Sequence, residues 1–354
     1  MQKIVIKVGS NVLTNPNGGL DLAILRSICT QLTQLKKQGN DIVLISSGAV
    51  ASGRSLVQLP EKIDDISRRQ VLAAVGQVRL ISLYADIFQE LGFHCAQVLV
   101  TKEDFRDRGH YLNMKNCIEA LLRNGIVPII NENDVVSVTE LMFTDNDELA
   151  GLVSSMLGVD RLIILSNVDG IFTGHPSHPD SKLIEEVGYH QTNLGQYISK
   201  EKSQFGRGGM LTKSSIAHKV AGLGIHVHIA NGKQADILPR IVAEQKVGTH
   251  FVPKKNASNI KRWVANAEGF AKTAIVVDEG ARKALLSDRP VSLLPVGVKE
   301  IEGSFSKGDV VKIKDLSGTV LGIGRTQFAS EKLEEFKDQK RQKELIHYDY
   351  LFLY

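Results

Sequence analysis

Short apolar runs alternate with helical patterns from the first residues to about residue 252, and this alternation constrains the fold most. Buried strands are predicted at "KIVIKV" (3–8), "DIVLIS" (41–46), "CAQVLV" (95–100), "IVPII" (126–130), "RLIILS" (161–166) and "IHVHIA" (225–230). Helices are predicted between these runs, over residues 21–38, 67–91, 110–124, 147–157 and 213–221. Apolar strands separated by helices are typical of a mainly parallel sheet with helices on both faces, so we predict an α/β fold of this kind.

The sequence changes character at "VPKKNASNIKRW" (252–263), a polar connector that carries the basic residues Lys254, Lys255, Lys261 and Arg262. Short β-like runs with frequent turn signals follow it. We therefore predict two domains, residues 1–253 and 260–354, joined by a linker at 254–259, with the second domain small and β-rich. The charged segment 331–344 predicts a solvated helix.

Composition and charge exclude several classes of protein. The chain has 354 residues, of which 43 are basic and 39 acidic, and its net charge of +4 is too small to indicate nucleic-acid binding by itself. No apolar run is long enough for a membrane span, and the N-terminus begins as a strand without a signal-peptide pattern. Cys29, Cys95 and Cys117 are scattered and lack metal-binding spacing, which predicts reduced thiols in a cytoplasmic protein.

Polar clusters follow the predicted strands at the points where these strands end. The clusters are Lys7–Ser10, Ser46–Ala49, "NENDVV" (131–136) with "TDNDELAG" (144–151), and Ser166–Asn167, while "GRGGMLTK" (206–213) precedes a helix. Each alone has a structural explanation, such as a helix cap, a solvated strand end or a flexible loop. Because ligands bind beyond the carboxyl ends of parallel strands, we expect the clusters to meet in one crevice. His226 and His228, which have no acidic or cysteine partner nearby, do not predict a metal site.

The segment 206–213 predicts a phosphate site, since glycines and a helix N-terminus offer backbone N–H groups to phosphate oxygens. Its spacing is not that of the P-loop, which has a glycine directly before the lysine. Lys7 and Lys213 suit the charge-spread transition state of phosphoryl transfer, and we expect Asp147 to hold both ammonium groups. No general base stands out. This favours a carboxylate as the acceptor, because a carboxyl group with a pKa of about 4.3 is already ionised at neutral pH.

Taken as a set, these motifs resemble the amino acid kinase family, and within it the glutamate 5-kinases. The residues that carry the resemblance are "VIKVGSNVLT", "ISSGAVASGR", "QVLAAVGQVRL", "IVPIINENDVV", "DNDELAGLV" and "GGMLTK", in this order. The fold so implied is an αβα sandwich around a mainly parallel sheet. The tail resembles a PUA domain, through "KRWV", "VDEGARKALL" and "SLLPVGV". The implied activity is ATP-dependent phosphorylation of the γ-carboxylate of L-glutamate to L-glutamyl 5-phosphate, the first step of proline biosynthesis.

The resemblance also implies a role for each matching residue. The catalytic residues would be Lys7, Lys213, Asp147 and Asp145. ATP would be bound by Lys7, Gly9, Ser166, Asn167, Arg207, Gly208, Gly209, Met210, Leu211, Thr212 and Lys213, and the amino acid by Ser47, Gly48, Asp134 and Asn146. The backbone N–H groups of Gly9 and Gly48 are expected to assist at the transferring phosphate. The implied cofactors are ATP and Mg²⁺, and no metal held by the protein alone is expected.

The sequence departs from the family pattern in three segments near the expected nucleotide site. Ser166-Asn167 stands where Thr-Asp is usual, His175 where an aspartate is common, and Arg207 where the family has a small polar residue. The first change removes an acidic contact and the last adds a positive charge, so an altered nucleotide preference is expected, while both lysines are kept.

The resemblance implies several partners: L-glutamate, further copies of the chain in a dimer or tetramer, proline as a feedback inhibitor, and glutamate-5-semialdehyde dehydrogenase as the receiver of a labile product. Two other functions stay open. One is a kinase for another acid, such as acetylglutamate or aspartate. The other is an RNA-binding protein with a kinase-like body, suggested by the basic connector and the PUA-like tail, although a spacer or oligomerisation module explains the tail as well.

Overall fold

The chain folds into two compact units, Met1–Lys255 and Asn256–Tyr354. The computed structural model describes residues 1–105, 108–137, 143, 145–176, 178–188, 209–254, 271, 273–287, 291–337 and 343–353. Most of the predicted linker lies outside these residues, so the boundaries 1–253 and 260–354 stay a prediction.

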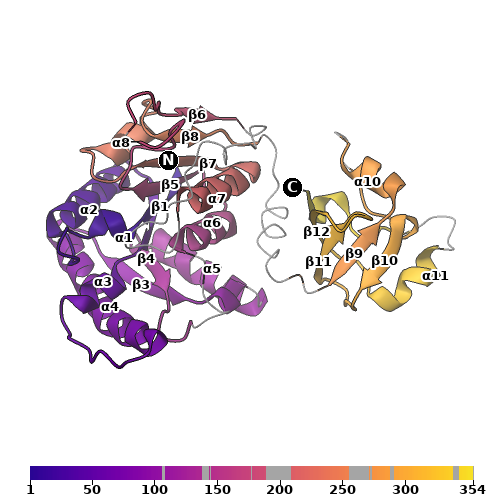
Figure 1. Cartoon of the computed structure of the whole chain (residues 1–354), viewed down its shortest axis with the longest axis horizontal. Coiled ribbons are helices and arrows are strands. Elements are labelled where there is room, and N and C mark those ends of the chain that lie inside the picture. Colours follow the sequence, from indigo (N-terminus) through magenta and orange to yellow (C-terminus); the bar gives the residue numbers. More distant parts are fainter. Residues whose placement is uncertain are drawn as a thin grey trace. The chain divides into compact units, whose positions relative to one another are not determined.

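Within the described residues, an eight-stranded sheet forms the centre of the first unit (Figure 1). Its order is β3-β4-β2-β1-β5-β7-β8-β6, in which neighbours from β3 to β7 pair in parallel and β8 runs antiparallel to β7. The strands are β1 Lys3–Val8, β2 Asp41–Ser46, β3 Cys95–Val100, β4 Val127–Glu132, β5 Arg161–Ser166, β6 Glu186–Val187, β7 His226–Asn231 and β8 Thr249–Phe251. The predicted strands are confirmed to within two residues, whereas β6 and β8 were not predicted.

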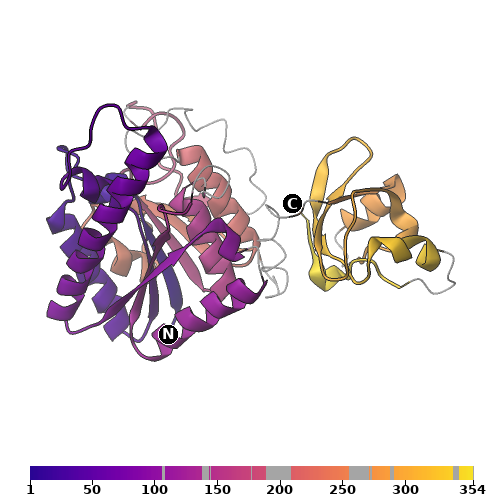
Figure 2. The ribbon, with the colours of Figure 1, turned by 90° about the horizontal axis from the view of Figure 1, so that it is seen from below.

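Helices cover both faces of this sheet (Figures 1 and 2). They are α1 Ser10–Leu13, α2 Leu22–Lys37, α3 Ala49–Arg54, α4 Asp65–Glu90, α5 Arg108–Arg123, α6 Asn146–Leu157, α7 Met210–Gly222 and α8 Ile237–Val242, with a 3-10 turn, η1, at Lys102–Phe105. Ile4, Ile6 and Val8 of β1 pack with α2, α4 and α8 in one apolar core. Because side chains alternate along a strand, Lys7 points to the opposite face, where α6 lies.

The long helices begin and end where their capping residues place them. The Asp21 carboxylate accepts from the N–H groups of Ala23 and Ile24, both at 3.1 Å, and α2 ends just before Gly39, whose φ is +87°. Asp145 caps α6 in the same way, and Gly158 ends it in the left-handed conformation. The bounds of the predicted helices agree with the observed ones to within three residues at each end.

Helices α3 and α4 approach so closely that their backbones touch. A Cβ atom on Gly53 would lie 2.0 Å from the carbonyl oxygen of Leu72, and one on Gly76 would lie 1.8 Å from that of Ala49. By length and composition α4 passes a test for a membrane span, but Tyr84 and Phe88 are fully buried in the core of the unit. Core helices of soluble proteins pass that test too, so this one helix is weak evidence for a membrane.

The second unit is β-rich, as predicted. Its described residues form a five-stranded sheet in the order β10-β9-β11-β12-β13. The elements are β9 Ala274–Val277, α10 Glu279–Leu285, η5 Pro295–Gly297, β10 Val298–Glu302, β11 Val310–Lys314, β12 Val320–Arg325, η6 Ser330–Lys332, α11 Leu333–Lys337, η7 Tyr348–Tyr350 and β13 Leu351–Leu353. The prediction of a solvated helix over 331–344 is confirmed in part: α11 is helical, and Glu331, Lys332 and Glu335 are exposed. The helix is not solvated on all sides, because Leu333 is buried and Phe336 packs on the core of this unit.

Candidate active site

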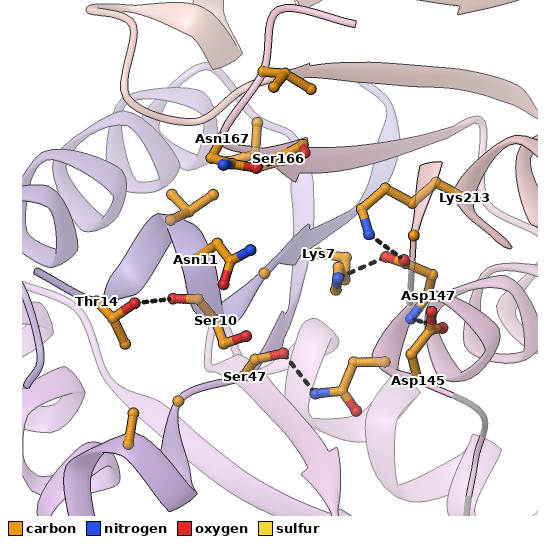
Figure 3. A pocket seen from close by; sticks show the side chains of 18 of the residues that line it. Lys7, Ser10, Asn11, Thr14, Ser47, Asp145, Asp147, Ser166, Asn167 and Lys213 are labelled. Atoms are coloured by element: carbon orange, nitrogen blue, oxygen red, sulfur yellow. Dashed lines mark hydrogen bonds and ion pairs between the residues drawn. The ribbon is translucent and has the colours of Figure 1, made fainter. Parts of the chain in front are cut away.

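A cavity of about 740 Å³ opens at the carboxyl ends of β1, β2, β4 and β5 (Figure 3). The predicted site residues that line it are Lys7, Gly9, Ser47, Gly48, Asp134, Asp145, Asn146, Asp147, Ser166, Asn167, Gly209, Met210 and Lys213. Leu211 and Thr212 are not among the lining residues, and Arg207 and Gly208 lie outside the described residues. Segments far apart in the sequence thus meet at the sheet edge where the polar clusters were predicted to converge.

Lys7 and Lys213 meet at a single carboxylate. The Nζ atom of Lys7 lies 2.6 Å from Oδ1 of Asp147, and Nζ of Lys213 donates to Oδ2 at 2.9 Å (Figure 3). Asp147 is fully buried and Lys7 nearly so. Burial alone would raise the pKa of Asp147, but the two ammonium groups outweigh it and hold that pKa below its usual value. The expectation that Asp147 holds both lysines is met in the geometry.

The start of α6 places two carboxylates at this point. Oδ1 of Asp145 accepts from the N–H groups of Asp147 and Glu148, at 2.9 and 3.1 Å. Its other oxygen, Oδ2, is buried and has no hydrogen-bond partner among the described residues. Burial and the charge of Asp147 raise the pKa of Asp145. A buried carboxylate oxygen without a partner can receive an ammonium group or share a metal ion with phosphate oxygens.

The side chain of Asn146 joins three strand and helix ends. Its Nδ2 donates to the Ser46 carbonyl at 3.2 Å, to Oγ of Ser47 at 2.9 Å and to Oδ1 of Asn131 at 3.0 Å. Asn131 in turn donates to Oε1 of Gln77 on α4 at 2.9 Å. Two of the residues predicted to bind the amino acid, Ser47 and Asn146, are therefore in direct contact.

Asp134 has a partner that the sequence did not reveal. Arg69 of α4 contacts Oδ1 of Asp134 with Nη2 at 2.5 Å and Nε at 3.2 Å. Glu132 of β4 also lines the cavity, and burial raises the pKa of its carboxyl group to about 7. Glu132 belongs to the "NENDVV" motif, so its place in the site could have been predicted from the sequence. Arg69 lies within a long helix, and no neighbouring residue indicates that it reaches the site.

One expected backbone contact is already taken. Gly9 lines the cavity, but its N–H donates to the carbonyl oxygen of Leu165 at 3.3 Å. That this group assists at a phosphate stays a prediction, which requires the bond to Leu165 to open. Asn11 of α1 also lines the cavity, and its buried Oδ1 has no hydrogen-bond partner among the described residues. Lys233, after β7, also lines the cavity and was not predicted.

Comparison with known proteins places this geometry in a family. Residues 2–231 match the model of the amino acid kinase family, and residues 273–348 match that of the PUA domain. The chain belongs to the amino acid kinase family. It is 52% identical to a glutamate 5-kinase of Chlorobaculum tepidum, over 99% of this chain and 97% of the relative. A glutamate 5-kinase of Bacteroides thetaiotaomicron is 49% identical, over 99% of this chain and 98% of the relative.

A solved amino acid kinase fold agrees with this assignment. The carbamate kinase from Giardia lamblia bound to AMP-PNP superposes with a TM-score of 0.54, covering 72% of this chain and 99% of its own. At 17% sequence identity this likeness shows the fold alone. The predicted αβα fold and the resemblance to the family are thus confirmed.

Two of the three departures from the family pattern, Ser166-Asn167 and His175, line the cavity. Ser166 ends β5 with its Oγ 3.5 Å from Oδ1 of Asn167, and its carbonyl accepts from the N–H of Gly232 at 2.8 Å. His175 is exposed and lines the cavity, while Arg207 lies outside the described residues. An altered nucleotide preference in this family member stays a prediction.

Proposed function

We propose that this amino acid kinase transfers the γ-phosphoryl group of ATP to the γ-carboxylate of L-glutamate, as an ATP:L-glutamate 5-phosphotransferase of proline biosynthesis. Relatives of nearly the same length that are 52% and 49% identical are glutamate 5-kinases, which supports this substrate. The observation that carries the chemistry is the buried Lys7–Asp147–Lys213 arrangement in the cavity.

The two lysines address the main obstacle to this reaction, the repulsion between two anions. One carboxylate oxygen of glutamate attacks the γ-phosphorus in line, and the bond from that phosphorus to the bridging oxygen of ADP breaks. In this proposal Lys7 and Lys213 neutralise the charge spread over the transferring group. Their contacts with Asp147, which would hold both before the substrate binds, support these roles. The acceptor is already ionised at neutral pH, since its pKa is about 4.3, so no general base is needed.

The remaining cavity residues bind and orient the two substrates in this proposal. Ser47, Gly48, Asn146 and Asp134 hold glutamate, and Asp145 shapes that end of the site. The nucleotide is held by Ser166, Asn167 and the start of α7, with Gly9, Arg207, Gly208, Leu211 and Thr212 kept as predicted contacts.

Mg²⁺ is proposed to arrive with ATP and to supply further positive charge at its phosphates. The chain fits an ion brought by the nucleotide, because Oδ2 of Asp145 is buried in the cavity wall without a partner among the described residues. No group of three or more His, Cys, Asp or Glu side chains that could hold a metal occurs among the residues that the structure describes.

The test is to trap the acyl phosphate with hydroxylamine. The purified protein with MgATP should give a hydroxamate with L-glutamate, and far less with acetylglutamate or aspartate. Lys213→Met should lower turnover much more than glutamate affinity, since its ammonium group acts on the transferring phosphate. Lys246→Met, which removes an exposed ammonium group outside the cavity, is the matched control. Equal hydroxamate yields from all three acids would refute the assignment of glutamate.

Finer points are proposed on the family resemblance alone. They are a cytoplasmic homo-oligomer, inhibition by proline, and delivery of the labile product to glutamate-5-semialdehyde dehydrogenase. RNA binding is the second candidate function, because residues 273–348 match the PUA domain. Binding of RNA by the full chain that weakens steeply with salt would support it, and no binding at low salt would dismiss it.

A further inference from the structure

Two successive residues of α4, Arg69 and Gln70, donate hydrogen bonds to the turn that follows β4. Arg69 makes both of its contacts to one oxygen of Asp134, through Nη2 at 2.5 Å and Nε at 3.2 Å. The next residue, Gln70, donates to the carbonyl oxygen of Val135 at 2.6 Å. The side chain of Asp134 is 9% exposed and that of Arg69 is 31% exposed, so the pair forms part of the cavity wall.

Asp134 would lose its charge easily without this partner. Burial raises its pKa, and Arg69 is the group that opposes the rise. Other charged groups lie nearby. Glu132, the last residue of β4, lies two residues before Asp134, and the charge of Glu148 on α6 contributes to raising the pKa of Glu132. Arg54 of α3 also lines the cavity. A carboxylate in this acidic, water-poor corner needs a fixed cation to stay ionised and correctly aimed.

We propose that Arg69 is the positioning residue of the amino-acid subsite: it holds Asp134 in place as an anion, so that Asp134 binds the α-ammonium group of the substrate. The inference rests on the proposed function, because only an amino acid substrate brings that ammonium group. Arg69 acts through Asp134 and does not touch the substrate. The arrangement makes α4 a determinant of specificity for amino acids over simple dicarboxylic acids.

The geometry admits one competing role for Arg69, direct binding of the substrate α-carboxylate. Its Nη1 atom has no hydrogen-bond partner among the described residues, and Arg69 lines the cavity, so this atom could donate to a bound carboxylate. Two competitors of glutamate separate the roles. Glutarate lacks the α-ammonium group but keeps both carboxylates, whereas 4-aminobutyrate keeps the ammonium group and lacks the α-carboxylate.

The experiment compares Arg69→Met, Arg69→Lys and the control Arg68→Met in the full-length protein. Arg68 is the neighbouring arginine of α4, and it donates to the carbonyl oxygens of Pro60 and Glu61, away from the cavity. For Arg69→Met we expect the KM for glutamate to rise by about tenfold to a hundredfold, the range for a hydrogen bond to a charged group. The kcat and the KM for ATP should change by less than about threefold, well below one factor of ten.

Inhibition constants decide the role. If Arg69 acts through Asp134, Arg69→Met weakens the binding of glutamate and the binding of 4-aminobutyrate by the same factor. The inhibition constant of glutarate then stays unchanged. The acid limb of the kcat/KM profile for glutamate also moves to higher pH, because Asp134 then protonates more easily. Arg69→Lys keeps the charge, so it should fold and retain most of the pH profile, and Arg68→Met should behave as the parent protein.

Other outcomes overturn the inference. Weaker glutarate binding with unchanged 4-aminobutyrate binding in Arg69→Met would show a direct contact to the α-carboxylate. Unchanged constants in Arg69→Met would show that Arg69 has no role. If Arg69→Met does not fold, Arg69→Gln, which also removes the charge, takes its place. An Arg69→Gln variant whose glutamate-to-glutarate preference and pH profile both match those of Arg68→Met overturns the inference too. Absence of any glutamyl hydroxamate from the parent protein would instead refute the proposed function.

Discussion

Asp147→Asn is the sharpest test of the site, because it keeps the size of the side chain and removes the one charge that Lys7 and Lys213 share. Both ammonium groups would remain in a buried cavity with no anion between them. Removing one partner of a buried ion pair costs about 3–5 kcal/mol of folding free energy. A unit of this size loses about 2–4 °C of Tm per kcal/mol, so the transition of the first unit should fall by about 6–20 °C.

Turnover should fall together with Tm. An amide oxygen can accept from one lysine, while its NH₂ group repels the other, so at least one ammonium group leaves its place. Loss of one such electrostatic contact to a transition state lowers kcat by about 10²–10³-fold. Scanning calorimetry gives the Tm, and hydroxamate formation at saturating MgATP and glutamate gives kcat. Asp86→Asn, on the exposed side of α4, is the control. A Tm within about 2 °C of the parent, less than 1 kcal/mol, would refute the reasoning.

Two further predictions concern the fold. Gly76→Ala should sharply reduce the yield of folded protein, because the added Cβ would lie 1.8 Å from the carbonyl oxygen of Ala49. Gly19→Ala should be tolerated, because its Cβ would have no atom closer than 3.6 Å. Circular dichroism of the soluble fraction checks both variants. His228 is buried beside Arg161 and the ring of His250, which lowers its pKa to about 2, so the folded state holds it neutral. Stability should therefore be complete above pH 6.5 and fall below it, by about 1.4 kcal/mol per pH unit, as the unfolded chain binds the proton. The Tm between pH 7 and pH 5 should fall less in His228→Gln; equal slopes would contradict this origin.

The sheet was predictable because its strands are apolar throughout and its long helices carry their own end signals. Asp21 caps α2 and Gly39 ends it, and both features are local in the sequence. The short elements α3 and β8 were missed since they have too few residues for a periodic pattern. Helix α3 depends on a tertiary contact, the fit of Gly53 against α4.

In the charged segment after residue 330 the helix was predicted, but its packing on the core was not. Its many lysines and glutamates favour a solvated helix, yet Leu333 and Phe336 anchor its start to the core of the second unit. Two apolar side chains decide the packing of such a segment, and an average over its composition hides them. The match of residues 273–348 to the PUA domain is consistent with a packed unit here.

The candidate site was predictable to the extent that it follows strand ends. Lys7 and Ser166 occupy the ends of β1 and β5 and needed only the rule that parallel strands share a carboxyl edge. Arg69 and Lys233 reach the cavity from a helix and a loop, so their place depends on how far a long side chain extends in the folded protein. The bond from the Gly9 N–H to Leu165 was not foreseen, because it continues the pairing between two strands that are far apart in the sequence.

The carboxyl groups of the site aspartates differ in the direction in which their pKa is shifted, and this difference predicts how substrate affinity depends on pH. Burial raises the pKa of Asp147, Asp145 and Asp134 alike, but two ammonium groups bring that of Asp147 below its usual value. Asp147 therefore stays charged when the solution is acidified, and the lysines stay in place. Asp134 and Asp145 protonate first, and each then loses its attraction for an ammonium group. Glutamate affinity should thus weaken on mild acidification before kcat does, and a kcat that fell first would contradict this division of roles.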